Sequence, residues 1–233
     1  MASNRVNKVT VVKIGTLCCE VSELPGFSQQ IKNELGVGGG STVTLVNGTA
    51  TLLIDTGFDY ESVNNRTNNT MNARGMIMAL RLIGVKPDDI DAVFITHWHR
   101  DHFGNLPVFE KAEHLASSGL VERFGLKGFR SITEGENILP GVQMLLTPGH
   151  TVDHASITVD SAVAGLKARI GVAGDAIVSH SYLQAGRIWQ YNADFYSAED
   201  ASRSIRQLLE DCDVIIPGHG TPFLAPKLSW TDR

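Results

Sequence analysis

The feature that most constrains the fold is a run of metal-binding side chains directly after an apolar segment. Residues 91–96 read Asp-Ala-Val-Phe-Ile-Thr, which is typical of a buried strand, and residues 97–102 read His-Trp-His-Arg-Asp-His. Imidazole and carboxylate groups are ligands for zinc and other first-row metals. A solvated polar loop or a single structural histidine does not need three imidazoles and a carboxylate within six residues. The run therefore predicts a metal site, with two ions.

Three further candidate ligands stand at equivalent places along the chain. His150, Asp175 and His219 each follow a short apolar run and lie in a segment that contains Gly, Pro or Thr. Loops at strand ends, held by a rigid sheet, are where binding and catalytic sites usually lie. The repeated placement favours one site built from several strand ends over isolated polar residues.

The rest of the chain indicates strands with a few helices. Asn47-Gly48 between two strand-like runs predicts a β-hairpin. Apolar residues at helical spacing predict a helix over 73–84, with Gly84 as its C-terminal cap, and a second helix that begins at the N-cap Ser197. No linker or change of composition divides the chain, so residues 1–233 are predicted to form a single domain.

Composition and charge limit the classes of function. The chain is 42% hydrophobic and 19% charged, as in ordinary globular proteins, and its apolar runs are too short to span a bilayer. The N-terminus lacks a secretory signal, so we expect a cytoplasmic protein without a membrane partner. A net charge of −5 with no Lys/Arg-rich run disfavours nonspecific nucleic-acid binding. A small-molecule substrate is therefore the main expectation, with RNA as an alternative.

Taken together, these motifs resemble those of the metallo-β-lactamase superfamily. The resemblance covers roughly residues 40–223, and the segments that carry it are 53–57, 96–102, 147–151, 173–175 and 217–220. It implies an α/β (α+β) fold, a four-layer αββα sandwich with metal ions in a cleft at one edge of the two sheets. Within the superfamily, the chain resembles the subgroup of metallo-β-lactamase domain-containing protein 1 and its microbial relatives, which share the run 102–109.

The resemblance also implies a role for each ligand. The implied ligands of the first ion are His97, His99 and His150. Those of the second ion are Asp101, His102 and His219. Asp175 would bridge the two ions. Asp55 is expected beside the ligands, where it would orient one of them and fix its tautomer. His154 has either a similar role or a purely structural one. A histidine at position 99 favours the hydrolase branch with zinc, because the flavodiiron branch has a glutamate there.

The expected chemistry follows from two cations side by side. They would lower the pKa of a shared water and give a bridging hydroxide, the nucleophile, near neutral pH. Asp101 or the second metal would handle the proton and the leaving group. The leading hypothesis is a hydrolase with two Zn²⁺ per chain, or with Fe or Mn, that cleaves an ester, lactone, thioester or phosphodiester. The alternatives are an RNA-cleaving nuclease like the animal member of the subgroup, a mononuclear iron oxidoreductase of the persulfide dioxygenase kind, and a non-catalytic binding module.

Two segments are expected to form the walls of the cleft. Residues 176–196 have little periodicity and many aromatic rings, which is typical of a pocket wall or lid. The alternative is that these rings cover the core or form a homodimer contact. The asparagine-rich segment 58–70 is the candidate for the opposite wall. The candidate substrate contacts of the first segment are His180, Tyr182, Trp189 and Tyr191.

Overall fold

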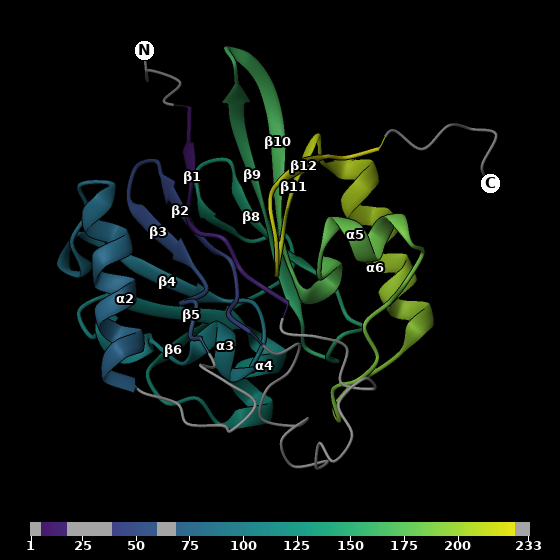
Figure 1. Cartoon of the computed structure of the whole chain (residues 1–233), viewed down its shortest axis with the longest axis horizontal. Coiled ribbons are helices and arrows are strands. Elements are labelled where there is room, and N and C mark those ends of the chain that lie inside the picture. Colours follow the sequence, from purple (N-terminus) through teal and green to yellow (C-terminus); the bar gives the residue numbers. More distant parts are fainter. Residues whose placement is uncertain (1–5, 18–38, 60–68, 227–233) are drawn as a thin grey trace.

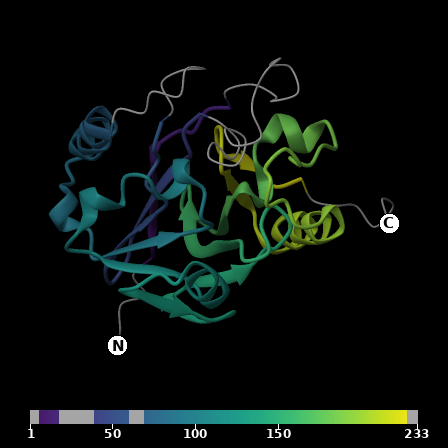
Figure 2. The same cartoon turned by 90° about the horizontal axis from the view of Figure 1, so that it is seen from below.

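The computed structural model describes residues 6–17, 39–59 and 69–226. Two six-stranded β-sheets stack face to face, and helices cover their outer faces (Figures 1 and 2). The four-layer αββα architecture predicted from the sequence is therefore confirmed. Within the described part of the chain, no helix is long and apolar enough to cross a membrane. The single domain over residues 1–233 stays a prediction.

The first sheet contains the strand that leads into the histidine-rich run. In sheet order its strands are β1 (Lys8–Lys13), β2 (Val43–Asn47), β3 (Thr51–Ile54), β4 (Ala92–Ile95), β5 (Glu113–Ser117) and β6 (Phe129–Ile132). β2 and β3 pair antiparallel with Asn47 opposite Thr51, so the predicted hairpin is confirmed. β3 to β6 are parallel, which brings the ends of β3 and β4 to the same edge of the sheet.

The second sheet delivers the other candidate ligands. From one edge of the sheet to the other, its strands are β7 (Asn137–Leu139), β8 (Val142–Leu146), β9 (Ala155–Val163), β10 (Leu166–Gly174), β11 (Val214–Pro217) and β12 (Phe223–Leu224). β8, β9 and β10 pair antiparallel, whereas β10 and β11 are parallel. The loops after β10 and β11 therefore leave the sheet at one edge.

The helices occupy the two outer layers. They are α2 (Asn69–Leu82), α3 (Arg100–Phe103), α4 (Ser118–Phe124), α5 (His180–Gln184) and α6 (Ala198–Asp211), with short 3₁₀ turns η2 (Pro87–Asp89), η3 (Leu106–Phe109) and η4 (Asp175–Ile177). Gly84 caps α2 with φ of +77°, and the Ser197 hydroxyl accepts a hydrogen bond from the Asp200 amide at the start of α6, as predicted. The predicted start of the first helix is wrong, because α2 begins four residues earlier, at Asn69.

Three apolar layers hold these elements together. The layer between the sheets includes Phe94 and Leu115 from the first sheet and Ile157 from the second, all with no exposed surface. A second layer packs α2 and α4 against the first sheet, and a third packs α6 against the second sheet. Because both sheets are buried on both faces, their edges are rigid platforms for loops.

Replacement of a core leucine tests this packing. We expect Leu115→Ala, at a fully buried position, to lower the free energy of unfolding by about 2–5 kcal/mol through lost apolar burial and the cavity left behind. The same change at Leu166, which is 74% exposed, should alter it by less than about 0.5 kcal/mol. Urea unfolding in excess chelator measures both. Equal effects of the two changes would contradict the assigned inter-sheet core.

Candidate metal centre

The predicted ligands meet where the two sheets share an edge. The segment after β4 carries four of them, with His97 and His99 in the loop and Asp101 and His102 in the first turn of α3. His150 lies in the loop after β8, Asp175 in η4 after β10, and His219 in the loop after β11. Each of the seven side chains is buried. The fold therefore brings together residues that are up to 122 positions apart in the chain.

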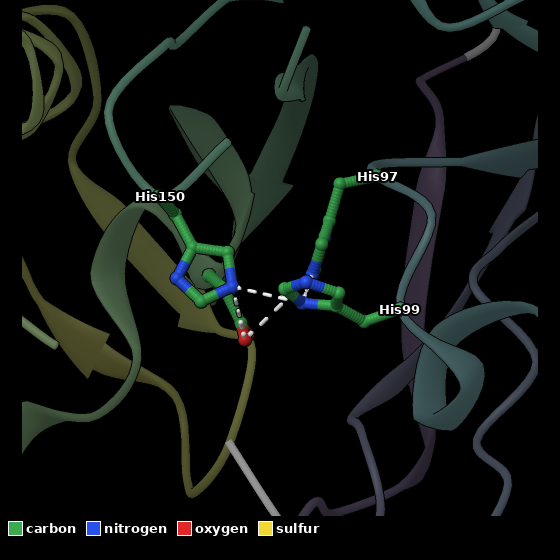
Figure 3. Close-up of side chains that lie close together, drawn as sticks. His97, His99 and His150 are labelled. Carbon is green, nitrogen blue, oxygen red and sulfur yellow. Dashed lines mark hydrogen bonds and ion pairs between the residues drawn. The ribbon is translucent and has the colours of Figure 1, made fainter. Parts of the chain in front are cut away.

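Three imidazoles form the first group of ligand atoms (Figure 3). His99 Nδ1 lies 2.9 Å from His97 Nε2 and 3.0 Å from His150 Nε2. Burial holds the pKa of His97 and of His150 well below its ordinary value, so both rings are neutral. A neutral imidazole has one nitrogen lone pair to donate. Three such nitrogens that face one another suit a cation at their centre.

The second group consists of one carboxylate and two imidazoles. Asp101 Oδ2 lies 3.3 Å from His219 Nε2 and 3.7 Å from His102 Nε2. One ligand atom from each of the three side chains lies within 4.8 Å of the other two. The group offers the mixed nitrogen and oxygen donors that zinc and related ions accept.

Asp175 stands between the two groups and turns one oxygen toward each. Its Oδ2 lies 3.3 Å from His150 Nε2, whereas its Oδ1 lies 3.3 Å from both His102 Nε2 and His219 Nε2. Burial raises the pKa of Asp175, but the three imidazoles outweigh burial and hold it well below its ordinary value. The carboxylate is therefore ionised and in the position of a bridge.

The hydrogen bonding of the cluster tests whether cations fit. Within the described residues, both carboxylate oxygens of Asp101 and of Asp175, and the Nε2 atoms of His102 and His219, are buried without a hydrogen-bond partner. Buried polar atoms normally have such partners, and isolated buried carboxylates are costly. A divalent cation in each group would take lone pairs from these carboxylates and imidazoles. The donor set therefore fits divalent metal ions.

A second layer of contacts orients the ligand rings. The Asp55 carboxylate accepts a 2.7 Å hydrogen bond from His102 Nδ1 and further bonds from Thr96, which leaves His102 Nε2 for the cluster. His219 Nδ1 donates to the Thr16 carbonyl oxygen at 3.0 Å, which leaves His219 Nε2 for the cluster. Such partners fix tautomers and raise ligand basicity. Asp55 is thus placed for the orienting role expected from the sequence, and that role stays a prediction.

His154 lies beside the ligands and does not belong to either group. Its Nδ1 is 2.8 Å from Thr147 Oγ1, and its ring centroid is 5.0 Å from that of His97. Burial lowers the pKa of His154 to about 3, which keeps the ring neutral. Both roles expected for it, orienting and structural, fit this position.

The aromatic segment 176–196 is divided between cleft and core. Trp189 and Tyr182 line a cavity together with His150 and Asp175, as expected for a pocket wall. Tyr191 is not part of that lining and packs edge-to-face on Trp189, with ring centroids 5.0 Å apart.

His180, the fourth candidate substrate contact, points elsewhere. It stacks on Phe223 with ring centroids 4.2 Å apart, and it is absent from the lining of the cavity. In the other expected wall, Phe58 is fully buried, and residues 60–68 lie outside the described part of the chain.

Sequence reasoning missed three residues of this second layer. Asp194 Oδ1 lies 3.0 Å from His99 Nε2, and the Asn192 side-chain amide donates to the His150 carbonyl oxygen at 2.9 Å. The third is Thr16, through its backbone carbonyl. None of them lies in a motif; for Asn192 and Asp194, the only signal was the density of aromatic rings in 176–196, and for Thr16 there was none.

A family model described as the metallo-beta-lactamase superfamily matches residues 35–219. The chain belongs to this superfamily. Metallo-beta-lactamase domain-containing protein 1 of Xenopus laevis is 32% identical over 242 residues, which cover 97% of this chain and 95% of the relative. The predicted similarity to that subgroup is therefore confirmed.

Two further comparisons agree with this assignment. An N-acyl homoserine lactonase of Bacillus cereus is 31% identical over 140 residues, which cover 49% of this chain and 55% of the lactonase. A crystal structure of a candidate metallo-β-lactamase from Thermotoga maritima superposes with a TM-score of 0.63 at 18% identity, over 94% of this chain and 99% of that one. The seven buried residues form two groups that could each hold a metal ion, in a chain of this superfamily.

A glycine beside the bridge gives a first test of this centre. A Cβ at Gly218 would collide with Asp175 Oδ1 and lie 2.9 Å from the Gly174 carbonyl oxygen, so the carboxylate would have to move. We expect Gly218→Ala to bind metal at least about tenfold more weakly, as measured by competition with a chromophoric chelator. Gly75→Ala in α2, where nothing lies within 4 Å, is the matched control and should bind normally. Unchanged affinity in Gly218→Ala would contradict the bridging position.

The charge state of the second group predicts a pH dependence of metal binding. Burial lowers the pKa of His219, but Asp175 and Asp101 outweigh it and raise the pKa to about 9; that of His102 is raised as well. Both rings are therefore protonated at neutral pH in the metal-free chain, and an ion must displace their protons.

Affinity for the second equivalent of Zn²⁺ should consequently rise about tenfold or more per pH unit from pH 7 to 9 and then level off. Titration calorimetry in buffers of different ionisation enthalpy measures the protons released. Binding without proton release at pH 7 would contradict the protonated state of these rings.

Proposed function

We propose that this chain is a dinuclear zinc hydrolase that cleaves an ester bond of a small molecule, with lactones as the first substrate class to test. Thioesters and phosphodiesters belong to the same reaction class. The observation that carries the proposal is the position of Asp175, which offers one oxygen to each of two buried ligand groups.

The chemistry is divided among the side chains. Two divalent ions in these groups would supply Lewis acidity and a water of lowered pKa. Because the rings of His97 and His150 are neutral, they can lie close together in the first group. The Asp175 carboxylate fixes the distance between the first group and the second. Asp101 Oδ1 has no hydrogen-bond partner among the described residues and can accept a proton as the ester is attacked. Trp189 and Tyr182 supply aromatic surface to the lining of the cavity beside His150 and Asp175.

Four considerations favour this function over the alternatives. A mononuclear iron oxidoreductase needs only the three-histidine group, yet His102 and His219 are buried with their Nε2 atoms directed at Asp175. The net charge of −5 disfavours RNA as substrate. The Bacillus cereus relative is named as a lactonase, which supports a lactone. A binding module would not require the full set of ligands.

Elemental analysis and activity together test the proposal. Purified protein should contain about two metal ions per chain, with zinc in preference to iron when grown without added metal, and chelator should abolish hydrolysis of a lactone probe. Asp175→Asn should lower kcat/KM more than about 100-fold, because loss of a bridging ligand exceeds the 10–100-fold effect typical of outer partners.

The controls separate metal chemistry from folding and from choice of substrate. Glu199→Gln, at a position with 86% side-chain exposure on α6, should keep both metal and activity. Ester, thioester and phosphodiester probes assayed beside the lactone identify the bond that is cleaved. A chain that binds one iron ion, or that hydrolyses its substrate equally well with chelator present, would overturn the proposal.

A further inference from the structure

We propose that Asp194 is a positioning residue for the metal centre, and that through it the segment 192–196 controls the metal affinity of the three-histidine group. The inference rests on the proposed binding of a metal ion by His99 Nδ1. It differs from the expectation that residues 176–196 serve as a wall of the cleft.

The geometry around His99 carries the argument. His99 turns Nδ1 toward His97 and His150, and its other ring nitrogen, Nε2, lies 3.0 Å from Asp194 Oδ1. A neutral imidazole carries its proton on one nitrogen only. A carboxylate beside Nε2 accepts that proton, so it leaves the Nδ1 lone pair directed at the cluster.

Asp194 is itself held in place from two sides. The Asn192 side-chain amide donates to Asp194 Oδ1 at 3.0 Å and to the His150 carbonyl oxygen at 2.9 Å. The Arg123 guanidinium on α4 lies 3.8 Å from Asp194 Oδ2 and donates to the Asp153 carboxylate at 3.2 Å. The carboxylate is therefore fixed relative to two of the three histidines of the first group.

Backbone contacts fix the segment at the same place. The Tyr196 and Ser197 amides both donate to the Gly149 carbonyl oxygen, at 3.0 and 3.2 Å, directly before His150. Movement of residues 192–197 would therefore shift the His150 loop and remove the carboxylate from His99 together. The segment is coupled to the metal centre through its backbone as well as through Asp194.

The side chain of Asp194 is 30% exposed, and this has a functional consequence. A partner of a metal ligand that lies at the protein surface can be reached by solvent or by a bound molecule, whereas the side chain of Asp55 is only 3% exposed. Of the two carboxylates that contact ligand rings in this way within the described residues, Asp55 and Asp194, the side chain of Asp194 is thus the more exposed to solvent. Its removal should alter metal binding without opening the core.

Metal affinity of the full chain, measured by competition with a chromophoric chelator, tests the inference. Asp194→Ala should weaken binding of the first equivalent of Zn²⁺ about 10–100-fold, and Asp194→Asn should weaken it less, because the amide oxygen can still accept from His99. The visible absorption spectrum of the Co²⁺-loaded protein should change for the first equivalent, since the ring donates less electron density. Glu199→Gln, which removes an exposed carboxylate five positions further along the chain, is the control.

The outcomes separate this inference from the proposed function. If wild-type protein binds no metal, the dinuclear centre itself is wrong. If wild type binds two ions, and Asp194→Ala has the wild-type affinity and Co²⁺ spectrum, the positioning role is overturned. A lower unfolding midpoint of the metal-free Asp194→Ala chain, with unchanged affinity, would show a purely structural contact and would also overturn it.

Discussion

The burial of five imidazoles and two carboxylates around one small volume is the constraint on which the rest of the structure depends. Each buried polar atom left without a partner costs on the order of 1–3 kcal/mol, so the metal-free cluster would relax if its loops were free to move. Backbone hydrogen bonds between the sheets prevent this on both sides of the cluster. The Ala155 amide donates to the Thr96 carbonyl at 2.9 Å, and the Thr42 amide to that of Gly218 at 2.7 Å.

The second layer of partners explains an unusual backbone conformation. Asp55 has φ of +59°, a left-handed region that costs a non-glycine residue on the order of 1–3 kcal/mol. The conformation brings its carboxylate within hydrogen-bond distance of the Thr96 amide and of His102 Nδ1. The backbone strain at Asp55 is thereby offset by its hydrogen bonds, which fix the end of β4 and the ring of His102 relative to each other. The ligands are thus held by the fold before any ion is added.

Sequence patterns predicted most of the fold and all seven members of the cluster. Strong local signals were decisive: the Asn47-Gly48 turn, the Ser197 cap and the apolar runs before His97 and His219 all correspond to elements of the structure. The start of α2 was predicted wrongly because Asn69 and Thr70 carry no apolar periodicity. Segment 176–196 was equally obscure, since α5 is only five residues long and its rings are divided between cavity and core.

The sequence by itself determined which chemical groups are present and that each follows a strand, because strand periodicity and ligand type are local properties. The tertiary structure alone decided which groups meet. It turned the two oxygens of Asp175 toward different histidines, placed His180 against Phe223, and brought Asp194 to His99 from 95 residues away. Such contacts depend on the packing of two sheets and on the course of an irregular loop. No short-range pattern in the chain encodes either of them.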